Sequence, residues 1–178
     1  EKKAQTGDKD SKIELEILQR IKETSEQEKP IRTMDFTKEE MVIVRQFNFL
    51  TIKPLIYVAN MGEEDITNPE GNEYYVALKN YADKEDCQVV PISAQIESEL
   101  AGLEPEDRAV FMEDLGLEVS GLDQLIHAAY ALLGLKTFFT VGSDEVRAWT
   151  FKDGMTAPEM AGIIHTDFQK GFIKAETY

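Results

Sequence analysis

Cysteine and histidine are scarce in this 178-residue sequence. Cys87 is the single cysteine, and His127 and His165 are the two histidines. One cysteine excludes an intramolecular disulfide or a cysteine cluster, and two histidines are too few for a histidine-based metal site. No apolar run approaches the roughly 20 residues of a membrane span, and the charged N-terminus has no signal-peptide core. We therefore expect no metal site, no membrane partner and a cytoplasmic protein.

Positive charge is also scarce, and its deficit is uneven along the chain. The sequence holds 19 Lys and Arg residues against 34 Asp and Glu residues, a net charge of −15. Residues 136–178 hold 5 basic and 6 acidic residues, whereas residues 1–135 hold 14 and 28, a net charge of −14. An acidic surface repels phosphate backbones. The C-terminal part is therefore the better candidate for contact with RNA or a ribosome.

Residues 1–29 are mostly charged and carry one narrow apolar stripe. Ile13, Ile17 and Ile21 recur every four residues with Leu18 beside them, which predicts an amphipathic helix. A narrow stripe on a charged helix is typical of one arm of an antiparallel helical hairpin. A partly disordered terminus is the alternative.

Residues 30–135 show the pattern of an α/β domain. Thr37 and Glu40 form a capping box that starts a helix. The continuous apolar run Leu55–Ala59 predicts a strand buried on both faces, and Gln88–Ile92 predicts a second strand. The helix between the strands is marked by apolar residues at helical spacing: Tyr74, Leu78 and Tyr81. This order predicts a βαβ unit with parallel strands and a right-handed crossover.

The pattern changes near residue 135, where we expect a domain boundary. Thr137–Val141 and Glu145–Phe151 are β-rich and are joined by a glycine-containing turn, which predicts a hairpin. A helix over residues 157–165 and a further strand at Phe172–Glu176 are expected after it. The residues that set helix ends in this half of the chain are Pro105, Ser120, Gly134, Thr156 and Glu159.

Two polar loops directly follow the two predicted parallel strands. Asn60-Met61-Gly62-Glu63 comes after Ala59, and Ser93-Ala94-Gln95 comes after Ile92. In an open parallel sheet, ligands bind beyond the carboxyl ends of the strands, so both loops should lie at one edge and could hold a flat heterocycle. Each loop alone has a plainer explanation, because asparagine can start a turn and serine can cap a helix.

Both loops resemble base-contacting motifs of P-loop GTPases. The first is similar to Asn-Lys-x-Asp in an altered N-x-x-E form, and the second is similar to Ser-Ala-Lys. The surrounding sequence resembles the YchF branch of the Obg-like ATPases across essentially the whole chain, and its last part resembles the TGS module. The segments that carry this resemblance are Lys53–Asn60, Pro91–Glu97, Glu145–Thr150 and Gly162–Phe168.

The resemblance implies an architecture in three parts. Residues 1–29 would be the returning arm of a helical hairpin (a coiled-coil insert), and residues 30–135 the C-terminal part of a parallel-sheet P-loop NTPase domain. Residues 136–178 would form a partial α+β domain of the β-grasp (TGS) type. The implied activity is binding and hydrolysis of ATP, coupled to association with ribosomes.

The resemblance also assigns roles to the residues of the two loops. Asn60 would bind the purine edge, Met61 would lie along the base and Glu63 would set base preference. On the far side, the site would be closed by the second motif: Ser93, Ala94 and Gln95. Ribosomal contact would use the TGS module and the hairpin tip, whose basic residues are Lys2, Lys3 and Lys9.

A phosphate-binding loop of the form G-x-x-x-x-G-K-[ST] does not occur in these 178 residues. We therefore expect no catalytic residue in this sequence, an inactive isolated chain, and ligands for phosphate and Mg²⁺ upstream of residue 1. A GTPase remains one alternative. A non-enzymatic ribosome- or RNA-binding adaptor with a vestigial nucleotide pocket is the other.

Two further groups of polar and aromatic residues have structural explanations. His165, Thr166 and Asp167 are adjacent, but no nucleophile stands at a suitable spacing, so we expect them to fix a turn between a helix and a strand. Trp149 and Phe151 alternate on one strand face, which predicts core packing. An exposed aromatic face there would instead suit RNA stacking.

Overall fold

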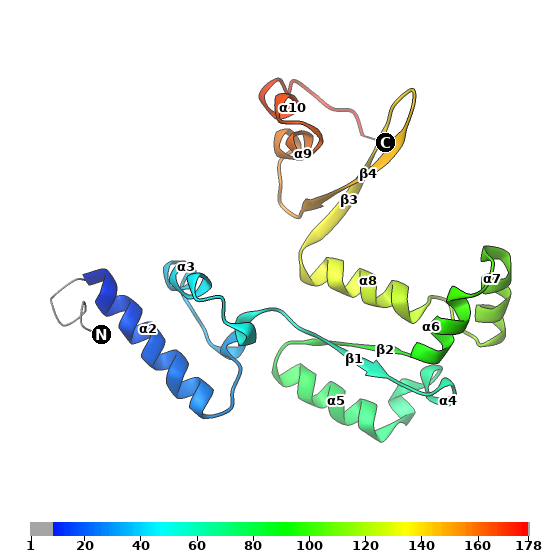
Figure 1. Ribbon diagram of the computed structural model, residues 1–178, viewed down its shortest axis with the longest axis horizontal. Coiled ribbons are helices and arrows are strands. Elements are labelled where there is room, and N and C mark those ends of the chain that lie inside the picture. The colour runs from blue at the N-terminus through cyan, green and yellow to red at the C-terminus, as the bar shows by residue number, and fades with distance from the viewer. Residues whose placement is uncertain (1–8, 178) are drawn as a thin grey trace. The chain divides into compact units, whose positions relative to one another are not determined.

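The computed structural model describes residues 9–177, and its chain divides into two compact units (Figure 1). The first unit contains the residues up to Leu55 together with Asn80–Cys87. The second contains Ile56–Lys79 and the residues from Gln88 onward. No helix within residues 9–177 is long and apolar enough to cross a membrane.

The first unit is built around helix α2 (Lys9–Glu26). The other elements are η1 (Ile31–Thr33), α3 (Lys38–Gln46) and η2 (Leu50–Ile52). The core consists of Ile17, Ile21, Ile31 and Val44, each at most 4% exposed. The predicted helix is thus confirmed, but its stripe is buried only in part, because Ile13 is 48% exposed. Lys2 and Lys3 of the expected hairpin tip lie outside the described residues.

Helix α3 begins at the predicted capping box. The Thr37 backbone N–H donates to the Glu40 carboxylate at 2.9 Å, and the Glu40 N–H donates to the Thr37 hydroxyl at 3.2 Å. Arg20 of α2 forms an ion pair with Glu40 and donates to the Asp35 carbonyl at 3.0 Å. The Thr37 N–H, followed by Arg20, lowers the pKa of Glu40. These contacts fix α3 against α2.

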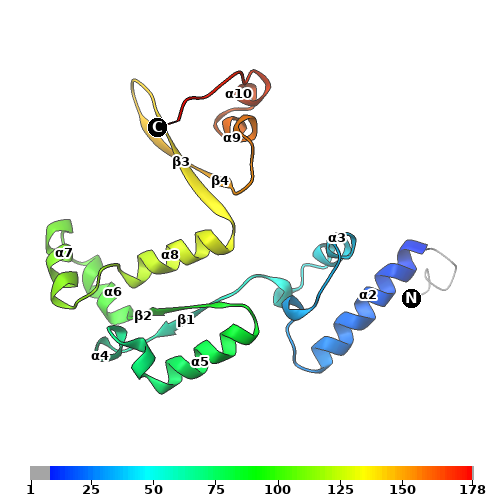
Figure 2. The same ribbon diagram turned by 180° about the vertical axis from the view of Figure 1, so that it is seen from behind.

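The second unit contains the predicted βαβ arrangement (Figure 2). Strands β1 (Ile56–Asn60) and β2 (Gln88–Ile92) are parallel, with Ile56 opposite Gln88 and Asn60 opposite Ile92. The connection between them contains α4 (Glu63–Ile66), η3 (Pro69–Gly71) and α5 (Glu73–Lys84). Helix α8 (Gly121–Leu132) packs on both strands, and α5 lies on the other side of the pair in Figures 1 and 2.

The prediction that the first strand is buried on both faces is wrong. Val58, at the middle of β1, is 42% exposed, whereas Val90 opposite it on β2 is 3% exposed. Within the described part of the chain the parallel sheet has two strands. A continuous apolar run is typical of a strand in a wider, covered parallel sheet, and among residues 9–177 no further strand pairs with β1 or β2.

The three helices after β2 are α6 (Ala94–Ala101), α7 (Pro105–Asp114) and α8. Pro105 begins α7, as predicted. The Ser120 hydroxyl accepts from the Asp123 N–H at 3.0 Å and so caps α8. Gly134, directly after α8, has φ +62°, a conformation that favours glycine at a helix C-terminus.

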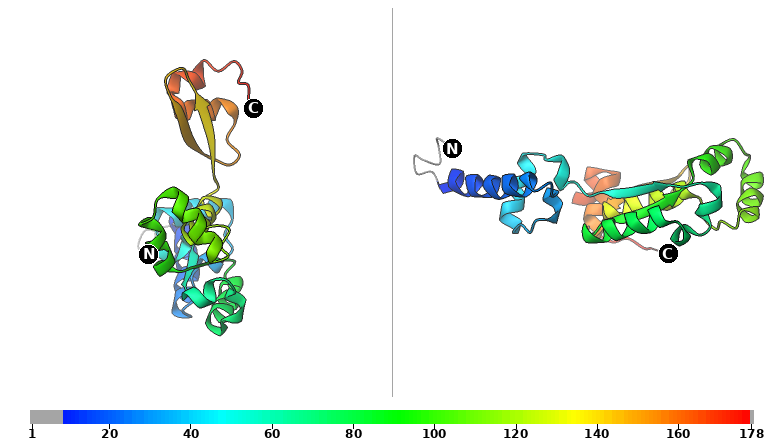
Figure 3. Two further views of the ribbon diagram at one scale, coloured as in Figure 1. Left: turned by 90° about the vertical axis from the view of Figure 1, so that its right-hand side faces the viewer. Right: turned by 90° about the horizontal axis from the view of Figure 1, so that it is seen from below.

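An antiparallel hairpin and two short helices complete the chain (Figure 3). Strand β3 (Leu135–Val141) pairs with β4 (Val146–Lys152), as predicted. Helix α9 (Ala157–Ile164) packs on β4 and on α10 (Thr166–Lys170). The Glu159 carboxylate accepts from the Thr156 N–H at 2.7 Å at the start of α9, where the second capping box was expected.

One face of the hairpin carries Phe138, Trp149 and Phe151, whereas Phe139 on the other face is 69% exposed. Trp149 and Phe151 are both half-buried, and Phe138 lies opposite Trp149. The rings of Phe138 and Phe151 meet edge to face with 5.9 Å between centroids. The indole N–H of Trp149 donates to the Thr140 hydroxyl at 2.9 Å. This face packs as predicted for a core face.

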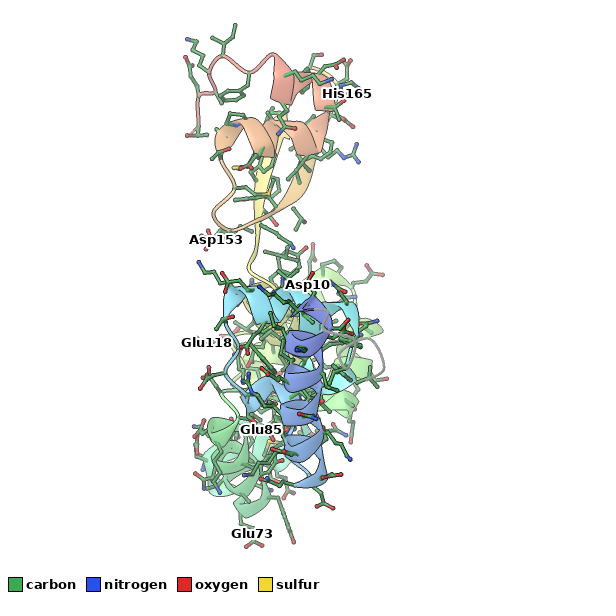
Figure 4. The ribbon with its side chains drawn as sticks, turned by 90° about the vertical axis from the view of Figure 1, so that its left-hand side faces the viewer. Asp10, Glu73, Glu85, Glu118, Asp153 and His165 are labelled. Carbon is green, nitrogen blue, oxygen red and sulfur yellow. The ribbon has the colours of Figure 1, made fainter. Side chains whose placement is uncertain are left out.

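The predicted strand at Phe172–Glu176 is not formed, and α10 was not predicted. Residues 172–177 have no regular structure, and Ile173 is 92% exposed. A strand needs a partner for its backbone groups, and β3 and β4 pair only with each other among residues 9–177. His165 joins two helices rather than a helix and a strand: its Nδ1 accepts from the Asp167 N–H at 3.2 Å. Figure 4 shows His165 and Asp153 at opposite ends of this part of the chain.

Candidate nucleotide-base site

The two predicted base loops meet at the carboxyl ends of β1 and β2. The Met61 N–H donates to the Ile92 carbonyl at 2.8 Å, which extends the pairing of the strands by one residue. Directly beyond it, the Asn60 side-chain oxygen accepts from the Ala94 N–H at 3.0 Å. One hydrogen bond therefore joins the first residue of one motif to the second residue of the other, across 34 residues of sequence.

This bond determines what the Asn60 side chain can offer to a ligand. Its Oδ1 atom is engaged by the Ala94 N–H, and Asn60 is exposed. The Nδ2 group carries two donors and has no partner among the described residues. A donor held in this way fits a ring nitrogen with a free lone pair, such as N7 of a purine. Asn60 Nδ2 is therefore the side-chain group that Asn60 offers to a ligand.

Met61, Gly62 and Glu63 form the turn from β1 into α4. Gly62 is the N-cap of α4, with φ −69° and ψ 162°, and Glu63 is the first helical residue. Glu63 is exposed and Met61 is half-buried. A carboxylate in the first turn of a helix lies in a favourable field, although α4 is only four residues long. Met61 presents a polarisable thioether rather than a charge at this position.

A surface hollow of about 290 Å³ lies beside the first motif. Its residues come from β1, the following turn and the start of α5: Ala59, Asn60, Met61, Gly62, Asp65, Asn72, Tyr74, Tyr75 and Leu78. The second motif does not line it. The hollow therefore borders the first motif on the α5 side.

The three residues of the second motif differ in exposure. Ser93 is 3% exposed, and its side chain makes no capping hydrogen bond to α6. Ala94 and Gln95 are exposed, and the Gln95 amide donates to Glu99 at 3.3 Å. The Ser93 hydroxyl therefore does not cap α6. Ala94 and Gln95 are the residues of this motif that face solvent.

Two polar residues that support the loops were missed by the sequence reasoning. The Glu97 carboxylate accepts from the Gly121 N–H at 2.7 Å, which fixes α6 to the start of α8. Asn72 caps α5 and also donates to Asp65. An asparagine before a helix is a recognisable N-cap signal. The hydrogen bond between Glu97 and Gly121 joins residues 24 positions apart, so it leaves no local signal in the sequence.

No cluster of three or more His, Cys, Asp or Glu residues that could hold a metal ion occurs between residues 9 and 177. The side-chain donors and acceptors of the candidate site are the amides of Asn60 and Gln95, the exposed Glu63 carboxylate and the buried Ser93 hydroxyl. Together with backbone groups, such a set can hydrogen-bond to the edge of a heterocycle.

Comparisons with known proteins agree with the family resemblance. Residues 135–178 match the YchF-GTPase_C family, described as a protein of unknown function (DUF933). The chain is 53% identical over 176 residues to the ribosome-binding ATPase YchF of Bacillus subtilis, covering 99% of this chain and 48% of that protein. It is 46% identical over 177 residues to the protein of the same name from Escherichia coli O157:H7, with 99% and 48% covered.

A solved structure gives the same result for the fold. The structure of the Schizosaccharomyces pombe YchF GTPase superimposes with a TM-score of 0.80 at 34% identity, covering 93% of this chain and 44% of that one. The α/β fold is thus that of a P-loop GTPase-type protein. Within that class, the chain belongs to the YchF type. It spans about half the length of the curated relatives it matches.

Proposed function

We propose that this chain supplies base recognition in a ribosome-associated ATPase. The main support for this proposal is the hydrogen bond between Asn60 and Ala94, which joins the two base motifs. This bond leaves the Asn60 amide nitrogen available to a ligand. The curated relatives are named ribosome-binding ATPases, which supports both parts of the proposal. ATP is the proposed ligand, with Mg²⁺ at its phosphates.

Each residue of the two motifs has its own role in recognising the base. Asn60 donates to N7 of the purine ring, Met61 lies along the base and Glu63 sets the preference between bases. Ala94 and Gln95 close the far side, with Ser93 beneath them. Residues that cradle phosphates would have to come from outside these 178 residues, because the sequence holds no phosphate-binding loop. The isolated chain should therefore show no ATP hydrolysis above background.

The role of Asn60 is tested by nucleotide titration of the full-length protein that carries this sequence. Asn60→Ala should weaken ATP binding roughly tenfold or more, because it removes the hydrogen bond to the ligand and the bond that joins the two loops. Asn80→Ala, an exposed asparagine of α5, is the matched control and should leave affinity unchanged. Equal affinities for wild type and Asn60→Ala would refute the assignment.

We propose that ribosome contact uses the part of the chain from residue 136, as a TGS module, together with the hairpin tip near Lys9. Residues 136–178 have a net charge of −1, against −14 for the remainder. Arg147 lies over the Trp149 ring at 4.2 Å, which presents a cation on the hairpin. The double change Arg147→Glu and Lys170→Glu should reduce co-sedimentation with ribosomes and flatten its salt dependence. Lys84→Glu with Lys53→Glu is the matched control of equal charge change.

Two alternative functions can be distinguished by experiments on the same full-length protein. A GTPase is favoured by the name of the fission-yeast structure, and a competition titration of ATP against GTP decides between them. A non-enzymatic adaptor would sediment with ribosomes while binding neither nucleotide. Tight ATP binding by the full-length protein would exclude that adaptor.

A further inference from the structure

Asn72 ties the first base motif to the start of α5 by hydrogen bonds in two directions. Its Nδ2 group donates to Asp65 Oδ2 at 2.9 Å. Its Oδ1 atom accepts from the backbone N–H groups of Tyr74 and Tyr75 at 3.0 and 3.1 Å. The amide has one satisfactory orientation here. A rotated amide would set its oxygen against a carboxylate and its NH₂ group against two N–H donors.

The segment that Asn72 holds contains the residues proposed to select the base. Asp65 belongs to α4, which begins at Glu63 and directly follows Met61 and Gly62. Helix α4 is a single turn of four residues with no buried side chain. So short a helix is unstable by itself, and its position must be set by contacts from outside it. The bond between Asp65 and Asn72 is such a contact.

The hollow beside the motif shows where this contact acts. Asn60, Met61 and Gly62 line it from the β1 side, and Asp65 and Asn72 line it as well. Asn72 is half-buried in this wall. Loss of the bond to Asp65 would free α4, and with it Met61 and Glu63, to move away from the end of β1.

We propose that Asn72 is a positioning residue for base selection, acting on Met61 and Glu63 through Asp65. The inference rests on the proposed function, because it assigns no contact between Asn72 and the nucleotide. Asn72 has two separable tasks. Its oxygen caps α5, and its NH₂ group holds α4.

The variants separate these tasks. Asn72→Asp keeps the capping oxygen, since aspartate caps helices as well as asparagine does, but sets a second carboxylate against Asp65. Asn72→Ser keeps a capping oxygen and removes the donor without adding charge. The double change Asp65→Asn with Asn72→Asp exchanges donor and acceptor and restores the hydrogen bond at unchanged net charge. Asn80→Asp, on the exposed surface of α5, is the control for added charge.

The measurement is a competition titration of ATP and GTP with the full-length protein. Asn72→Asp and Asn72→Ser should weaken ATP binding roughly tenfold, the scale of a lost hydrogen bond to a charged group, and should lower the ratio of ATP to GTP affinity. The exchanged pair should recover to within about twofold of wild type. The inference would be overturned if both single variants kept the wild-type ratio of ATP to GTP affinity. It would also be overturned if the exchanged pair bound ATP as weakly as Asn72→Asp does.

Hydrogen exchange of the Met61 and Gly62 amides in the same variants separates failure of this inference from failure of the proposed function. Exchange should accelerate in the single variants and return to the wild-type rate in the exchanged pair. A wild type that binds neither nucleotide refutes the proposed function and the role in base selection together. Unchanged exchange in Asn72→Asp and Asn72→Ser refutes the positioning itself, whatever the nucleotide result.

Discussion

Replacement of Glu97 by alanine should destabilise the second unit and loosen the second base loop. Glu97 Oε1 accepts from the Gly121 N–H at 2.7 Å, and Gly121 is buried at the start of α8. Hydrogen bonds to charged groups contribute about 1.5–3 kcal/mol, and a buried N–H left without a partner costs about 1–3 kcal/mol. The N-terminal end of α8 adds a favourable field for the carboxylate. We expect Glu97→Ala to lower the free energy of unfolding by about 2–3 kcal/mol.

Urea denaturation followed by far-ultraviolet circular dichroism measures this change. Glu97→Gln keeps a hydrogen-bond acceptor without the charge. It should lose about half as much free energy of unfolding as Glu97→Ala, because neutral hydrogen bonds are about half as strong as charged ones. Glu99→Ala is the matched control: Glu99 is exposed on the same helix, and its carboxylate accepts from the Gln95 amide at 3.3 Å. Equal stabilities of Glu97→Ala and Glu99→Ala would show that the bond to Gly121 does not hold α6 to α8.

Three further substitutions test other contacts. Gly121→Ala should destabilise by about 1–3 kcal/mol in urea denaturation, because an added Cβ would lie 2.8 Å from an Ile92 methyl group. Arg32→Met should cost about 3 kcal/mol in the same assay, because it removes the ion pair between Arg32 and Glu85, whose side chain is 7% exposed. The Thr37 N–H and Arg20 lower the pKa of Glu40 below its usual value of 4.5. The stability that the Glu40 carboxylate contributes is therefore present above pH 4.5 and is lost as the pH falls below it. Thermal unfolding of Glu40→Gln should therefore depend less on pH between neutral and acid conditions.

Local patterns in the sequence predicted most of the second unit. The strand after Pro54 and the strand at Gln88–Ile92 are apolar runs of strand length, and both form within one residue of the predicted limits. Ser120 is a capping residue, as is Thr37 in the first unit, and the effect of a cap depends on the next three residues alone. The adjacency of Asn60 and Ala94 followed from the parallel pairing, because consecutive parallel strands end at the same edge.

Features that depend on distant neighbours could not be predicted in this way. The segment at Phe172–Glu176 has the composition of a strand, but a strand forms only beside a partner, and no partner lies beside it in the described part of the chain. The exposure of Val58 has the same cause. Glu97 and Gly121 are brought together by the packing of α6 and α8, so neither residue shows its role locally. Asn72 did carry a local capping signal, but its bond to Asp65 did not.

Base preference of the full-length protein tests the central claim most directly. The usual aspartate of the first motif grips two donors on guanine, N1–H and the N2 amine, whereas adenine has an acceptor at N1 and no N2 amine. Glu63 is one methylene longer, and Met61 stands where lysine is usual, so guanine preference should fall by roughly 1–3 kcal/mol. In a competition titration, wild type should favour ATP, and Met61→Lys with Glu63→Asp should shift preference toward GTP, while the control Glu64→Asp should not. A wild type that binds GTP about tenfold more tightly than ATP would contradict the proposed function.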